Sequence, residues 1–165
     1  IKESFYAFIS TPLQIYKGSQ VPPLCGAMPF PINEQIIPTG SYACTKIHDD
    51  YILVYITGFD PEELKYHCCD ADPDQEEVKE FVIPINELTP LPTTAPARRT
   101  KATTFSQRAR VLGLWPQDNG FTSVFYPATV KSPPSNVGDW YKLIFDETDG
   151  TALPIPEKLI VRIPE

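Results

Sequence analysis

The stretch "SYACTKIHDDYILVYITGF" (residues 41–59) decides the fold class of this chain. Its two apolar runs are rich in aromatic and β-branched residues and flank the polar turn "HDD", which is typical of a β-hairpin. Further strands are predicted after it at residues 64–70 and 78–85, and "NELTPLP" (86–92) closes the set. Strands this close together leave no room for crossover helices, so we expect an antiparallel sheet that curls into a barrel and thereby protects its edges.

A second set of strands repeats this rhythm in the C-terminal half. The predicted strands are residues 108–115, 123–131, 140–147 and 157–164. Turn-forming segments separate them, and the last of these connections, "TDGTALPIP", resembles the proline-bounded end of the first set. We therefore predict an all-β chain that contains two small antiparallel barrels in tandem.

The prediction divides the chain into three parts. Residues 1–38 form a proline-rich extension that packs on the main body or leads into it, with "SFYAFI" (4–9) as one short helix or strand. Residues 39–97 form the first barrel, and residues 98–165 form the second. The basic segment 93–110, with five bases and no acid, is either a solvated linker or a complement to an acidic surface.

Composition excludes several classes of protein. Proline occurs 19 times in 165 residues, and an internal proline breaks a helix, so long helices are not expected. A membrane span needs about 18 consecutive apolar residues, and the sequence has no such run. The first residue is Ile rather than Met, so we expect a domain excised from a longer protein.

The negative charge is concentrated in one segment. The chain has a net charge of -7, and residues 60–80, with nine acids and two bases, account for all of it. An acidic surface does not neutralise phosphates, so we expect no direct nucleic-acid partner. A localised acidic field instead favours a basic partner.

Neither the cysteines nor the histidines form a catalytic or metal motif. The four cysteines are Cys25, Cys44, Cys68 and Cys69. They lack the paired spacing of zinc ligands, and neighbours in a strand point to opposite faces. A zinc site with His67 or His48 is the alternative to reduced, buried thiols in a reducing compartment. We expect reduced, buried thiols and no bound metal. The sequence also has no glycine-rich phosphate loop, so we expect no cofactor and no enzymatic activity.

Three aromatic residues stand at predicted strand ends in the second half, each next to a turn. They are Trp115, Tyr126 and Phe145. Strand ends of a small barrel can meet at one rim, where aromatic faces attract a quaternary ammonium that has no N–H to donate. The alternative interpretation is that these rings are core residues, as aromatic residues in strands usually are.

Asp70 and Asp72 lie two residues apart at a predicted strand end, so their side chains share one face. Such a pair can hold a metal, act as acid and base, or clamp an ammonium. A hard cation needs about six oxygen ligands, and Pro73 interrupts the run. The pair therefore best fits a primary ammonium, either a free peptide N-terminus or a lysine, with a solvated acidic loop as the alternative.

The succession of "LKYHCCDADPD", "VIPINELTPLP", "RARVLGLWPQ", "FYPATV" and "YKLIFDE" resembles a known family. Over about residues 40–164 it is similar to the tandem Tudor domain of the SAGA-associated histone-binding subunit. The resemblance implies two SH3-like Tudor barrels and a reader of histone H3 that is di- or trimethylated on its fourth-residue lysine. It implies no enzymatic activity.

The resemblance also assigns roles to individual residues. The implied methyl-lysine cage consists of Trp115, Tyr126 and Phe145. The implied binding pair for the free amino terminus of the H3 tail is Asp70 and Asp72. The implied auxiliary peptide contacts are Gln117, Thr122 and Asp146. Two departures are a Trp in place of the usual Tyr at residue 115, and "DNGFTS" (118–123), which we expect to be a longer loop.

The implied partners are the methylated H3 tail and subunits of a SAGA-type histone acetyltransferase complex, which the chain would tether to chromatin in the nucleus. A scaffold module that docks another subunit through its acidic surface, with the rings as core, is the alternative from a different class. A third reading, nucleic-acid binding by the basic segment 93–110, predicts an affinity that falls steeply with salt.

Overall fold

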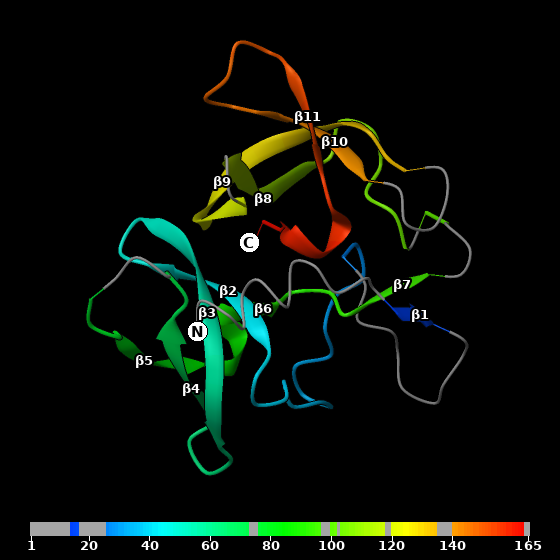
Figure 1. Cartoon of the computed structure of the whole chain (residues 1–165). Coiled ribbons are helices and arrows are strands. Elements are labelled where there is room, and N and C mark those ends of the chain that lie inside the picture. The colour runs from blue at the N-terminus through cyan, green and yellow to red at the C-terminus, as the bar shows by residue number, and fades with distance from the viewer. Residues whose placement is uncertain are drawn as a thin grey trace.

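Short β-strands make up most of the described residues, which confirms the predicted all-β class (Figure 1). The computed structural model describes residues 14–16, 26–72, 76–96, 100–101, 103–117, 120–134 and 140–163. Within these ranges the helical elements are two 3-10 turns. The predicted element at residues 4–9 lies outside the described residues.

The first set of strands runs from Tyr42 to Pro90. Its elements are β2 (Tyr42–Ile47), β3 (Asp50–Asp60), β4 (Lys65–Asp70), β5 (Glu80–Pro84), the 3-10 turn η1 (Ile85–Glu87) and β6 (Leu88–Pro90). The pairing order is β6-β2-β3-β4-β5, and all of these pairs are antiparallel. The predicted hairpin at 41–59 is therefore present as β2 and β3.

The second set repeats the first, element by element. It consists of β8 (Arg110–Gln117), β9 (Gly120–Ser132), β10 (Tyr141–Phe145), β11 (Ala152–Ile155), the 3-10 turn η2 (Glu157–Leu159) and β12 (Ile160–Arg162). The order is β12-β8-β9-β10-β11, again antiparallel. In each set the 3-10 turn joins the fourth and fifth strands without a pairing between them. Closure of each set into a barrel therefore stays a prediction.

Four segments differ from the sequence-based expectation. Residues 157–159, predicted as the start of a strand, form the 3-10 turn η2. Residues 152–155, predicted as a connection, are strand β11, which among the described residues pairs only with β10, and an edge strand tolerates Pro154. The expected loop 118–123 is largely strand, since β9 begins at Gly120 and the register continues to Gln117↔Gly120. The start of the basic segment is β7 (Thr94–Pro96), which pairs in parallel with β1 (Gln14–Tyr16).

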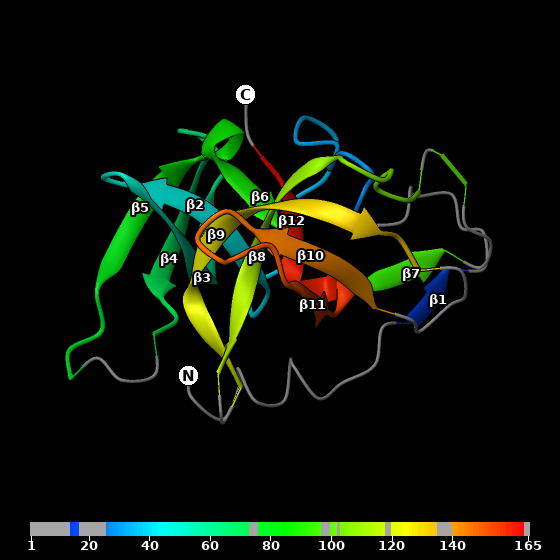
Figure 2. The ribbon, with the colours of Figure 1, turned by 90° about the horizontal axis from the view of Figure 1, so that it is seen from above.

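The two sets of strands meet at β3. Tyr51 and Ile52 of β3 pair with Phe125 and Val124 of β9, which joins both sets into one sheet of ten strands. Figures 1 and 2 show the two groups of strands on either side of this junction.

Strand β3 also supplies both hydrophobic cores. Successive strand residues point to opposite faces, so Leu53 joins the cluster that contains most of the second set, while Val54 joins the cluster of the first set. Both side chains are fully buried. Strand β2 divides in the same way, with Cys44 in the first of these clusters and Ala43 in the second, so the two cores share both strands.

A segment before each set is held by the same hydrogen bond. The backbone N–H of Ile37 donates to the buried hydroxyl of Tyr66 at 2.9 Å, and the N–H of Phe105 donates to that of Tyr141 at 3.0 Å. Each donor precedes the first strand of its set, and each tyrosine lies on the third strand. The N–H of Ile37 thus ties the segment before the first set to β4.

We expect Tyr66→Phe to lower the free energy of unfolding by about 1–3 kcal/mol, because it leaves the buried N–H of Ile37 without an acceptor. Urea denaturation measures this loss as a lower midpoint at an unchanged slope. Tyr51→Phe is the control, since within the described residues the Tyr51 hydroxyl makes no hydrogen bond. Equal midpoints for the two variants would contradict the prediction.

Candidate functional site

The three rings that the sequence suggested for a cage lie against one another in the structure. The ring centroids of Trp115 and Tyr126 are 5.8 Å apart, with an interplanar angle of 76°. Those of Trp115 and Phe145 are 4.7 Å apart, at 42°. The rings come from three neighbouring strands, β8, β9 and β10, so Trp115 is the residue that links the other two.

An irregularity in β8 sets the position of Trp115. The register of β8 against β9 shifts between Leu114 and Pro116. The backbone N–H of Trp115 donates instead to the hydroxyl of Thr122 at 3.0 Å, and that hydroxyl donates to the carbonyl of Val124 at 2.8 Å. Thr122, predicted as a peptide contact, therefore fixes the strand that carries the indole.

Gly113 provides the space in which Phe145 packs. A Cβ atom at residue 113 would lie 3.5 Å from two carbons of the Phe145 ring and 3.0 Å from Leu143 Cδ1. Any larger residue would push against both side chains. The sequence alone gives no sign that residue 113 must be glycine, because the requirement comes from β10, a strand distant in the sequence.

The three rings differ in exposure. Trp115 and Tyr126 are half-buried, whereas Phe145 is 1% exposed and belongs to the core cluster. A cation is held when it lies over a ring face within about 6 Å of the centroid. Trp115 and Tyr126 can offer such faces directly, while Phe145 can do so only if a neighbouring side chain shifts.

Asp70 and Asp72 lie together where β4 ends. The backbone N–H of Asp72 donates to Oδ1 of Asp70 at 2.8 Å, which forms a local turn that fixes the first carboxylate. Both side chains are half-buried. The chain direction there is set by Asp70 N–H donating to Lys79 O and by Ala71 N–H donating to Leu53 O.

Strands β4 and β9, which carry Asp70 and Tyr126, pair along the same edge of β3. Asp70 pairs with Val54, and Phe125, next to Tyr126, pairs with Tyr51. Strand β2 occupies the opposite edge of β3 at all these positions. The end of β4 and the start of the β3–β9 pairing therefore follow one another along one edge.

Asp146 is the acceptor of a bidentate ion pair. Nη1 and Nη2 of Arg110 donate to its Oδ1 and Oδ2 at 2.7 and 2.6 Å, and Nη1 also donates to the hydroxyl of Thr129 at 2.8 Å. The hydrogen bonds from Arg110 hold the pKa of Asp146 below its usual value. From the sequence, Arg110 was only one of the five bases of segment 93–110. In the structure it holds Asp146, the residue that follows Phe145. Gln117, the third predicted auxiliary residue, is exposed at the end of β8.

The described cysteines are buried thiols. Cys44, Cys68 and Cys69 form no disulfide, and burial raises the pKa of Cys68 to about 12. Burial also raises the pKa values of Cys44 and Cys69. In the described part of the chain, no three His, Cys, Asp or Glu residues are grouped as metal ligands.

No helix in the described residues has the length and apolar character that crossing a membrane requires.

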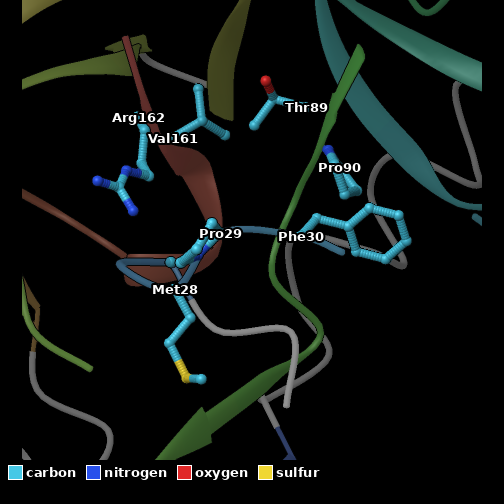
Figure 3. A pocket seen from close by; sticks show the side chains of 8 residues that line it. Met28, Pro29, Phe30, Thr89, Pro90, Val161 and Arg162 are labelled. Atoms are coloured by element: carbon cyan, nitrogen blue, oxygen red, sulfur yellow. The ribbon is translucent and has the colours of Figure 1, made fainter. Parts of the chain in front are cut away.

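A small hollow lies where the N-terminal extension meets β6 and β12 (Figure 3). Its lining consists of Gly26, Met28, Pro29, Phe30, Thr89, Pro90, Val161 and Arg162. Its volume of about 30 Å³ suits a single water-sized group. The Arg162 guanidinium donates to the carbonyl of Ala27 at 3.2 Å. We therefore interpret the hollow as a packing gap beside this hydrogen bond.

Comparison with known proteins identifies a family and two structural neighbours. The family model for the SGF29 tudor-like domain matches residues 36–164. The crystal structure of Arabidopsis thaliana AGDP1 AGD34 is similar at 9% identity, over 80% of this chain and 86% of that chain, with a TM-score of 0.43. The crystal structure of ADCP1 tandem Agenet domain 3-4 is similar at 10% identity, over 80% of this chain and 84% of that chain, with a TM-score of 0.39.

Proposed function

Because the chain belongs to the SGF29 tudor-like domain family, we propose that it is a reader of the histone H3 tail. It binds the free amino terminus of H3 and the di- or trimethylated lysine at the fourth residue of the tail. Tudor-like reader domains are typically non-catalytic, and the proposal assigns the chain no enzymatic step. Its role is to tether a SAGA-type histone acetyltransferase complex to chromatin in the nucleus, where the other subunits of the complex are its partners.

The observation that supports the proposal is that β4, which carries Asp70, and β9, which carries Tyr126, pair along one edge of β3. Val54, which pairs with Asp70, and Tyr51, which pairs with the neighbour of Tyr126, are three residues apart. At about 3.3 Å per residue, the strand sets them about 10 Å apart. An extended peptide covers the same length between its first and fourth residues. The shared strand thus acts as a ruler for a terminal amine and a lysine in one short peptide.

The acidic pair is suited to the terminal amine. An ammonium donates three hydrogen bonds, and an ionised carboxylate offers about four acceptor sites. The bond from Asp72 N–H fixes Oδ1 of Asp70, one of the carboxylate oxygens proposed to face the amine. The acidic segment 60–80 adds long-range attraction for a basic tail, which raises the association rate more than the final affinity.

The aromatic cluster is suited to the methylated lysine after one adjustment. In the free protein Trp115 packs on Phe145 and touches Tyr126 edge-on, so no ammonium fits between the rings. In the proposed complex the indole moves away from Phe145, and the ammonium takes its place against the exposed ring face. Tyr126 and Trp115 form the walls, and Phe145 forms the floor. Trp offers the strongest cation–π face.

The auxiliary residues support this arrangement. Thr122 and the Arg110–Asp146 pair hold the strand ends that carry Trp115 and Phe145. Gln117 and Asp146 remain predicted peptide contacts. Asp146 can bind a peptide while paired with Arg110, because a carboxylate has acceptor sites beyond the two that Arg110 uses.

Calorimetric titration with four H3-tail peptides tests the proposal. The peptides are unmodified, trimethylated at the fourth-residue lysine, acetylated at the amino terminus, or both. We expect a micromolar dissociation constant, about -8 kcal/mol, for the trimethylated peptide. Removing the methyl groups should weaken binding about tenfold, because cation–π contacts contribute about 0.5–2 kcal/mol each. Acetylation should weaken both forms.

Equal heats for all four peptides would contradict the reader function and favour the scaffold function. An effect of acetylation without an effect of methylation would retain the acidic pair as a site and exclude the cage.

A further inference from the structure

Strand β5 (Glu80–Pro84) forms an open edge of the sheet. It pairs with β4 and with no other strand among the described residues. Figures 1 and 2 both show it at the outside of the molecule, with no further strand beside it. A free edge is a template on which an extended segment can pair.

The backbone groups at this edge can be assigned from the two ends of the β4–β5 ladder. Asp70 N–H donates to Lys79 O, and Ile85 N–H donates to Leu64 O. Hydrogen bonding alternates along an antiparallel pair, so Phe81 and Ile83 bond to β4. Glu80 and Val82 direct their N–H and C=O groups outward, within the described part of the chain. Pro84 has no N–H and ends the usable edge.

The outer face beside this edge is flat and partly apolar. Val82 is 53% exposed, and its cross-strand partner, His67, is also exposed. The next residue in the row, Gly58 on β3, has no side chain. A side chain from an added strand could therefore lie on Val82 without displacing anything.

Carboxylates surround both ends of β5. The acidic residues in the described part of this region are Asp60, Glu62, Glu63, Asp70, Asp72, Glu76, Glu77 and Glu80, and the bases are Lys65 and Lys79. Lys65 has one weak ion pair, with Glu63 at 3.9 Å. The field along the edge is therefore negative. A second copy of this chain would bring the same acids against one another, so the edge disfavours self-association.

We propose that the edge of β5 docks a basic, extended segment of a partner protein as an added strand. The outward N–H and C=O groups of Glu80 and Val82 bind its backbone, Val82 contacts an apolar side chain, and the flanking acids attract its Lys or Arg residues. This site needs neither a free amino terminus nor a methylated lysine. It is therefore separate from the proposed histone site.

The test uses the peptide acetyl-Lys-Val-Lys-Val-Lys-amide, which has no free α-amine and no methylated lysine. We expect its addition to shift the amide signals of Glu80 and Val82 in NMR spectra of the whole chain. It should also slow hydrogen exchange of both amides about tenfold, as one added hydrogen bond of about 1.4 kcal/mol would do.

Val82→Pro isolates the edge. The substitution removes an outward N–H, a change that an edge strand tolerates, and leaves the bonds to β4 in place. We expect it to weaken the Lys-Val peptide about tenfold, whereas the control Val82→Thr, which keeps the N–H, changes the affinity little. The H3 peptides should bind Val82→Pro as they bind the unchanged protein, whatever the outcome for the reader function.

Equal affinity of Val82→Pro and Val82→Thr for the Lys-Val peptide would overturn the proposal. Signal shifts confined to Asp70 and Asp72 would also overturn it, because the peptide would then occupy the acidic pair. If Val82→Pro lowers the unfolding midpoint, the strand pairing is tested on the unchanged protein instead, with a Lys-Val peptide whose valines are N-methylated. Undiminished binding of that peptide excludes strand pairing.

Discussion

Asp70→Asn should weaken binding of the H3 tail about 10- to 100-fold, by a similar factor for methylated and unmodified peptides. A hydrogen bond to a charged group contributes about 1.5–3 kcal/mol, and every 1.4 kcal/mol changes an affinity tenfold. Asn retains an Oδ1 atom that can accept from Asp72 N–H, so the turn at the end of β4 is preserved. The loss would therefore report the charge rather than a collapsed loop.

Asp60→Asn is a matched control for this variant. Asp60 also lies in the acidic segment, and its Oδ1 accepts from the N–H groups of Glu62 and Glu63. The substitution removes the same charge from a similar turn at the far end of β3. Calorimetry should show little change in affinity for Asp60→Asn. Equal losses for Asp60→Asn and Asp70→Asn would mean that only the general field matters.

The amino-terminally acetylated peptide completes the argument. If Asp70 binds the terminal amine, acetylation and Asp70→Asn remove the same interaction, so their effects should not add. Additive losses would show that Asp70 acts on another part of the peptide.

Trp115→Ala should weaken the trimethylated peptide about tenfold or more and leave the unmodified peptide within about twofold, since the indole contributes up to about 2 kcal/mol of cation–π attraction. Phe145→Ala is a poorer test, because Phe145 is 1% exposed and its truncation costs about 3–5 kcal/mol of stability. Tyr126→Ala should be selective in the same way as Trp115→Ala.

Trp140→Ala is the matched control for the cage, because Trp140 is 51% exposed and belongs to neither core cluster. The chain has two tryptophans, so Trp140→Phe leaves Trp115 as the sole reporter of indole fluorescence. We expect the emission of this variant to change with the trimethylated peptide and not with the unmodified one. An equal loss of both peptides in Trp115→Ala would contradict the assigned role of the ring.

The strand pattern was predictable where alternation and turns coincide. The runs at 41–47, 51–59 and 64–70 correspond to β2, β3 and β4 because each is a short apolar run that ends at polar turn residues. The same reasoning missed β11, since Pro154 reads as a connection unless the strand is known to lie at an edge.

The residues of the candidate site could be proposed from the sequence, but the relative positions of their side chains could not. Trp115, Tyr126 and Phe145 stood out as rings at strand ends, and Asp70 and Asp72 as a pair on one face. The contributions of Gly113 and Arg110 were missed, because each acts on β10, about 30 residues away in the sequence.

The sequence by itself determined the all-β class, the concentrated acidic segment and the identity of the aromatic residues, since these follow from local alternation and composition. Only the tertiary structure decided that β3 joins β9, that β4 and β9 follow one edge of β3, and that Trp115 packs on Phe145. Those relations depend on pairings and packing between residues distant in the chain, and local propensity carries no information about them.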